Sequence, residues 1–341
     1  MTQSALADIL LPHDISVLFP MPKDPLDQEA VLVDAFISKI ALKQIPRLEP
    51  TLRKDTQATR LQLVAVRFDP PEIRLVWQIF HQLGNRIEAM DAAVHSFYQI
   101  TDEKTFLADL KKASSYSRNE VNILLPLSVH PTLKNEGING KYGKELISLI
   151  KKHARIDNLF KVTFMAMSLA ETKWDFGGMN LVKGELAPLI IPRVNTMEIQ
   201  TFINQSFHEF SGGFGPAPKG QDEFNRLVND SYKAQVREPQ NLLKAHLTSR
   251  RIENPRLETV DTMDCVSCHL AQTARTWIEN ESPSLAEEVE NKFTSKKYIL
   301  KNTTTDPGRT DNVHAFSYFL DMATINQRTI NETAMVLEKL N

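Results

Sequence analysis

The sequence has little cysteine, no excess of charge of either sign and no long hydrophobic run. Only two of its 341 residues are cysteine, which excludes a small fold held together by several disulfides. A net charge of −2 gives no basic field of the kind that attracts nucleic acid, so we expect no nucleic-acid partner. No apolar run approaches the ~20 residues that cross a bilayer, and we expect no transmembrane segment.

The first part of the chain mixes strand patterns with helix patterns. Runs of β-branched and aromatic residues predict strands at 61–69, 72–80, 91–100 and 160–169, and a hairpin over 173–192. Apolar residues at helical spacing predict helices at 102–113, 143–154 and 198–207. Strands and helices in mixed order favour an α+β sheet domain.

A segment rich in glycine and proline separates this part from the rest. Residues 211–220, SGGFGPAPKG, hold four glycines and two prolines, which predict a linker. Beyond it the patterns are mainly helical, and a last helix lies within 323–341. The sequence therefore predicts an α+β domain over 1–210, a linker, and a helical domain over 221–341.

Both cysteines lie in the pentad Cys265-Val266-Ser267-Cys268-His269. Two cysteines placed at random in a chain of this length fall three apart in only about 0.6% of arrangements, so the spacing calls for a chemical reason. In a helix, residues i and i+3 project from one face, with Cβ atoms roughly 5–6 Å apart. Two such thiols can add to two vinyl groups at one edge of a porphyrin, and the next histidine can bind the iron. The pentad thus predicts one covalent haem c, with thioethers from Cys265 and Cys268 and with His269 as the proximal ligand.

Three other kinds of site remain open for these cysteines. A structural zinc site needs four ligands, and the chain offers two cysteines and scattered histidines. A thioredoxin-like dithiol would follow a strand in a βαβ unit, whereas helical sequence flanks the pentad. A plain disulfide with an incidental histidine is the third. Haem attachment remains the favoured interpretation.

The pentad resembles the attachment motif of c-type cytochromes. The order of patterns over roughly residues 250–341 is also similar to a small cytochrome c domain. That family has an attachment helix, a loop with a methionine ligand, and a C-terminal helix packed across the first. The resemblance implies a cytochrome c-like helical haem domain with Met322, 53 residues after His269, as the sixth iron ligand. The rival candidate is His314, and less favoured ones are Met263, Met335 and His246.

These features predict an exported, single-haem c-type cytochrome-like protein that transfers one electron to an unidentified redox partner. Haem attachment of this kind requires export to a compartment such as the bacterial periplasm. The first 22 residues lack the basic start and long apolar core of a secretory signal, so we expect that a signal preceded Met1 and was removed. Two alternatives are a peroxidase-like haem enzyme with an open iron site, and a non-enzymatic envelope binding protein with an ancillary haem.

Overall fold

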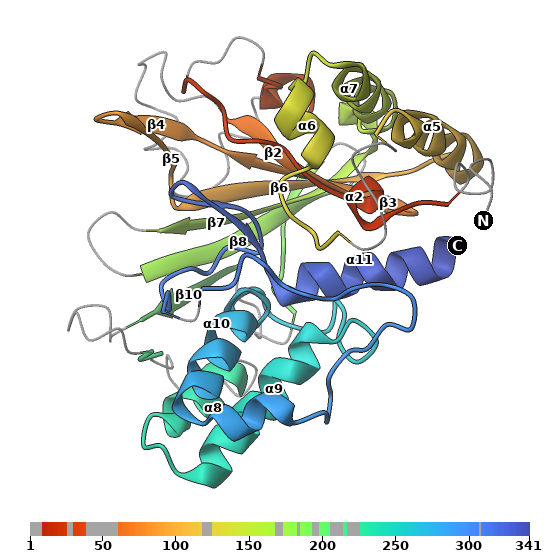
Figure 1. Ribbon diagram of the computed structural model, residues 1–341. Coiled ribbons are helices and arrows are strands. Elements are labelled where there is room, and N and C mark those ends of the chain that lie inside the picture. The colour runs from red at the N-terminus through yellow and green to blue at the C-terminus, as the bar shows by residue number, and fades with distance from the viewer. Residues whose placement is uncertain are drawn as a thin grey trace.

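An eight-stranded antiparallel sheet forms the middle layer of the computed structural model (Figure 1). The strand order is β1–β2–β3–β6–β7–β8–β10, and β9 pairs with β8. These strands are β1 (Ser16–Leu18), β2 (Gln62–Asp69), β3 (Glu72–Gln78), β6 (Ala92–Gln99), β7 (Leu159–Met167), β8 (Lys173–Val182), β9 (Glu185–Pro188) and β10 (Ile199–Ile203). The structure describes residues 9–25, 30–38, 61–117, 125–167, 173–182, 185–192, 198–204, 214–216, 226–306 and 308–341.

The strands expected from β-branched and aromatic runs are confirmed. The four single strands correspond to β2, β3, β6 and β7, and the expected hairpin corresponds to β8 and β9. The two residues at its turn, 183–184, lie outside the described residues. A further small hairpin extends from the end of β3 and consists of β4 (Phe80–Leu83) and β5 (Arg86–Ala89).

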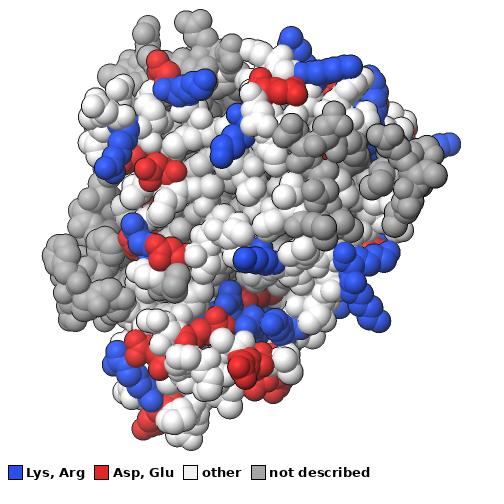
Figure 2. Space-filling view, in the orientation of Figure 1, with Lys and Arg blue, Asp and Glu red and all other residues white. Residues whose placement is uncertain are grey.

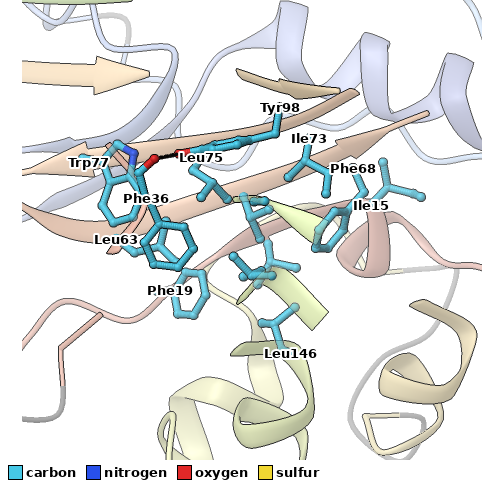
Figure 3. Packing of buried hydrophobic residues seen from close by; sticks show 14 of the residues in the cluster. Ile15, Phe19, Phe36, Leu63, Phe68, Ile73, Leu75, Trp77, Tyr98 and Leu146 are labelled. Atoms are coloured by element: carbon cyan, nitrogen blue, oxygen red, sulfur yellow. Dashed lines mark hydrogen bonds between the residues drawn. The ribbon is translucent and has the colours of Figure 1, made fainter. Parts of the chain in front are cut away.

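One face of the sheet is apolar because successive side chains of a strand alternate between its two faces. Leu75 and Trp77 of β3 point to this face and are fully buried. They pack in one cluster with Tyr98 of β6 and with Leu146 (Figure 3). The Tyr98 hydroxyl donates a hydrogen bond to the Phe36 carbonyl oxygen at 3.0 Å. This face therefore needs a cover of helices.

Three helices supply that cover: α5 (Glu103–Ser115), α6 (Pro131–Glu136) and α7 (Lys141–His153) (Figure 1). The expected helices at 102–113 and 143–154 are confirmed as α5 and α7. The first begins at Asp102, whose side chain accepts a hydrogen bond from the Thr105 backbone N–H at 3.0 Å. The second turns Leu146, Leu149 and Ile150 to the sheet.

Helices α10 (Cys265–Glu281) and α11 (Gln327–Leu340) lie below the opposite face of the sheet, and α8 (Arg226–Ala234) and α9 (Pro239–Glu253) pack on α10 as an outer layer (Figure 1). The mainly helical character expected for 221–341 is therefore present, with one addition. A hairpin of β11 (Phe316–Phe319) and β12 (Met322–Ile325) precedes α11. None of the helices that the structure describes is both long enough and apolar enough to span a bilayer.

The prediction of a helix at 198–207 was wrong. Residues Ile199–Ile203 form strand β10, which pairs with β8 at the edge of the sheet, and 205–207 lie outside the described residues. Phe202 is buried against Trp174 of β8, with their ring centroids 5.6 Å apart. The segment 199–203 has no clear helical or strand periodicity of its own, and it becomes a strand because it can form backbone hydrogen bonds with the edge of β8.

The chain has the α+β architecture expected from its sequence. Its hydrophobic clusters contain residues from both the early and the late parts of the sequence. One cluster joins α11 residues such as Leu337 to sheet residues such as Phe68. A second joins Phe176 of β8 to α10. Of the expected linker, the structure describes 214–216, where Phe214 is buried with its ring centroid 5.6 Å from that of Trp277. The division into domains stays a prediction.

Figure 2 shows basic and acidic side chains interleaved on one face, as a net charge of −2 leads one to expect.

Candidate functional site

The pentad forms the first turn of α10, and strand β10 holds this turn against the sheet. Asp264 is the N-cap, and its carboxylate accepts a hydrogen bond from the Ser267 backbone N–H at 3.0 Å. Gln200 of β10 donates to the same carboxylate at 2.6 Å and accepts from the Val266 N–H at 3.0 Å. The start of α10 is therefore fixed by backbone and side-chain contacts at once.

The rest of α10 is tied to α9 by buried ion pairs. The Arg275 guanidinium donates to both Glu253 oxygens, at 2.9 and 2.8 Å, and to Glu279 at 2.8 Å. The ring of His246 lies in the same network, 3.0 Å from Glu279. This contact engages His246, one of the less favoured ligand candidates, at the α9–α10 interface rather than in the cleft described next.

A cleft lies between the sheet, α10 and α11, and we call it the sheet–helix cleft. Its cavity volume is about 130 Å³. Cys265, Cys268 and His269 all line it, half-buried. Its apolar lining includes Phe97, Met165, Phe176, Leu189, Pro192 and Met263. The three chemically distinctive groups of the pentad thus open into one largely apolar space, as a flat aromatic cofactor requires.

The imidazole of His269 is held in a single tautomer. Its Nδ1–H donates to the Val313 carbonyl oxygen at 2.9 Å, which leaves Nε2 with a free lone pair. Burial lowers the pKa of His269 to about 4, so the ring is neutral at neutral pH. A histidine ligand whose other nitrogen binds a backbone carbonyl is the usual arrangement at metal centres.

The two thiols are free and not bonded to each other. Burial raises the pKa of Cys265 to about 12, and it also raises the pKa of Cys268. A redox-active dithiol works through a thiolate of lowered pKa, so these values disfavour the thioredoxin-like alternative. Within the described residues, no group of three or more His, Cys, Asp or Glu side chains is arranged to hold a metal ion, which leaves a zinc site short of ligands.

Two basic side chains, Arg74 and Lys161, line the cleft from the sheet. Arg74 on β3, Phe97 on β6 and Lys161 on β7 are cross-strand neighbours in one row. The Arg74 and Lys161 cations lie 4.7 and 4.8 Å from the Phe97 ring centroid. The Arg74 Nε is buried without a hydrogen-bond partner among the described residues, although its Nη2 lies 3.6 Å from Glu72. Such a row can receive anionic groups, including the propionates of a haem.

His95 of β6 also lines the cleft, and sequence reasoning missed it. Its ring centroid lies 6.2 Å from that of His269, with 29° between the ring planes. Phe176 of β8 contacts His269 as well, at 5.0 Å between centroids. Strand alternation puts His95 and Phe97 on one face of β6, but nothing in the sequence indicates that α10 lies over that face.

The two sixth-ligand candidates from the sequence lie elsewhere. Neither Met322, on β12, nor His314 belongs to the residues that line the cleft. His314 is 2% exposed, and its ring nitrogens lie 2.8 Å from Asp91 and 2.8 Å from Ser317. The order Asp–His–Ser matches that of a hydrolase triad, but Ser317 is only 1% exposed and cannot meet a substrate. This group is a buried hydrogen-bond network.

The cleft therefore brings together paired thiols, a neutral imidazole, apolar side chains and two basic side chains of the sheet. Comparisons of the chain with protein-family models, with curated proteins and with solved structures found no match. The assignment of function rests accordingly on the residues of the cleft.

Proposed function

We propose that the protein carries one haem c, bound covalently through Cys265 and Cys268 with His269 as the proximal iron ligand, and that it transfers single electrons. The observation that supports this most directly is the shared orientation of these three side chains. They open into one apolar cleft, and the hydrogen bond to Val313 leaves the ligating nitrogen of His269 free.

The attachment chemistry needs no oxidant. Each thiol adds across one vinyl group: a C–S bond forms, and the thiol hydrogen goes to the other vinyl carbon. A haem held there by Cys265, Cys268 and His269 would supply a one-electron Fe(III)/Fe(II) couple for exchange with redox partner proteins. The chain's own part is to hold the ring, to orient His269 and, through the apolar lining residues Phe97, Phe176 and Met165, to limit water in the cleft.

In this proposal the haem would be attached to a helix, as in the c-type cytochromes, but the wall of the pocket opposite that helix would differ. Here the cleft is closed by β3, β6, β7 and β8, so a sheet takes the place that a ligand-bearing loop has in that family. We further propose a periplasmic location, because thioether attachment is carried out after export. Electron transfer is favoured over peroxide chemistry because the apolar ring of Phe176 packs beside His269, at 5.0 Å between centroids.

The test is maturation of the full chain behind a secretory signal, in a bacterium with a haem-attachment system. We expect a reduced spectrum with the sharp α band of a c-type haem, and a mass increased by one haem that survives denaturation. The matched control is the double variant Cys265→Ala/Cys268→Ala, which should lose the covalent haem while keeping its circular dichroism spectrum. Wild-type protein without covalent haem from this host, or a double variant that retains it, would refute the proposal.

A further inference from the structure

The sheet wall of the cleft presents a second imidazole to His269. His95 lies in the middle of β6, where it pairs with Val76 of β3 and Thr163 of β7. Its position is central in the sheet, so neighbouring strands on both sides hold its backbone. The side chain is half-buried, lines the cleft, and has no hydrogen bond to any other described residue. It is therefore placed rigidly and is free to bind a ligand in the cleft.

The spacing of the two imidazoles is that of a pair on opposite sides of one metal ion. With metal–nitrogen bonds of about 2.0–2.1 Å, two trans imidazoles have ring centroids about 6.3 Å apart. The centroids of His95 and His269 are 6.2 Å apart. The planes of the two rings are inclined by 29°.

Other candidates for the same role are weaker on geometry. His314 has both ring nitrogens in hydrogen bonds, so it has no free lone pair. Met322 does not line the cleft. Met263 and Met165 do line it, so the methionine-to-iron band decides between a methionine and His95. Among the described lining residues, His95 is the one imidazole besides His269.

We infer that His95 is the second axial ligand, so that one iron joins β6 of the sheet to α10 of the helical layer. This inference rests on the proposed haem attachment and names the ligand that the attachment motif leaves open. Two consequences follow. The iron is six-coordinate and low-spin, with a lower potential than a His/Met haem would have. Haem binding also links residues 174 positions apart in the chain, so it should stabilise the sheet as well as α10.

The experiment uses the full, matured holoprotein and reads the iron spectroscopically. Wild-type ferric protein should show low-spin electron paramagnetic resonance and a near-infrared band of bis-imidazole type, without the methionine-to-iron band. His95→Ala should convert the iron to high spin and allow rapid CO binding in the ferrous form. Added imidazole should restore the low-spin spectrum. The comparison variants Met322→Leu and Met263→Leu should keep the wild-type spectrum.

A low-spin, CO-resistant His95→Ala protein would overturn the inference, as would conversion to high spin by either methionine variant. If His95→Ala does not accumulate, His95→Met provides an independent test, because it should introduce the near-infrared methionine band. A wild-type iron that is already high-spin and binds CO would also overturn it, and would favour a peroxidase-like site. Each of these results is read on protein that carries thioether-bound haem. If the protein carries no such haem, the proposed function is refuted instead, so failure of the ligand assignment can be told apart from failure of haem attachment.

Discussion

Two buried histidines far from the cleft, His13 and His130, carry a pH dependence of stability. Their ring centroids are 5.7 Å apart, and neither ring nitrogen of His13 has a hydrogen-bond partner among the described residues. Burial lowers the pKa of His13 to about 4 and that of His130 to about 3, from an ordinary value of 6.5. Both rings are therefore neutral in the folded protein, whereas the unfolded chain takes up protons below its ordinary pKa.

The sign of the effect follows from proton binding. Between pH 6.5 and 4 the unfolded state binds more protons at His13, so the free energy of unfolding should fall as the pH decreases through this window. For His13 alone the loss approaches roughly 3 kcal/mol at pH 4. Urea unfolding at several pH values should show that His13→Leu reduces this loss, whereas His81→Leu, at an exposed position, should not. Equal pH profiles for all three proteins would contradict the prediction.

At the scale of the element, α10 depends on its N-cap. The Asp264 carboxylate is buried, and it satisfies both the Ser267 N–H and the Gln200 side-chain amide. Asp264→Ala removes the cap and leaves the Gln200 donor unpaired. We expect it to lower the free energy of unfolding by about 2–4 kcal/mol.

Asp264→Asn is the matched control, because its amide oxygen can still accept from Ser267. It should cost less than half as much as the alanine variant, measured by urea unfolding of the full chain. Asp102→Ala offers a second comparison at the exposed cap of α5, where we expect about 1 kcal/mol. An alanine variant at 264 that costs no more than the one at 102 would show that the Gln200 contact contributes little.

At the scale of the whole molecule, a buried ion network joins the sheet to α11. Glu332 accepts from Arg67 of β2 and, at 2.7 Å, from Arg328 one turn earlier in α11. Arg328 also donates to the Ile252 carbonyl oxygen at 2.7 Å, which brings in the end of α9. The sheet and two helices are thus connected through charges removed from water.

Breaking this network should destabilise the entire chain. Glu332→Ala removes the carboxylate that Arg328 and Arg67 share and leaves Arg67 with Asp69, at 3.1 Å, as its remaining ion-pair partner. We expect a loss of about 3–5 kcal/mol. Tryptophan fluorescence and far-ultraviolet circular dichroism should report one shared transition, because the sheet and the helices share cores. In a double-mutant cycle with Arg67→Met, the combined loss should be smaller than the sum. Additive losses, or separate transitions for the two probes, would contradict this account.

Local pattern was enough to predict most elements and the residues that α10 contributes to the candidate site. Runs of β-branched and aromatic residues predicted β2, β3, β6 and β7, and apolar residues at helical spacing predicted α5, α7 and α11. The pentad identified Cys265, Cys268 and His269 because their mutual geometry depends only on a turn of helix, which they carry within five residues. The prediction at 198–207 failed because an open edge of β8 overrode a weak local preference.

The opposite wall of the cleft depends on contacts that no local pattern contains. His95 faces α10 because Leu75, Trp77 and Tyr98 turn the other face of the same strands to α5 and α7, and the alternation then leaves His95 on the free face. Which layer covers that face is settled by packing between segments far apart in the chain. A five-residue motif can specify its own chemistry through helix geometry, whereas its partner across a cleft is chosen by the folding of the whole chain.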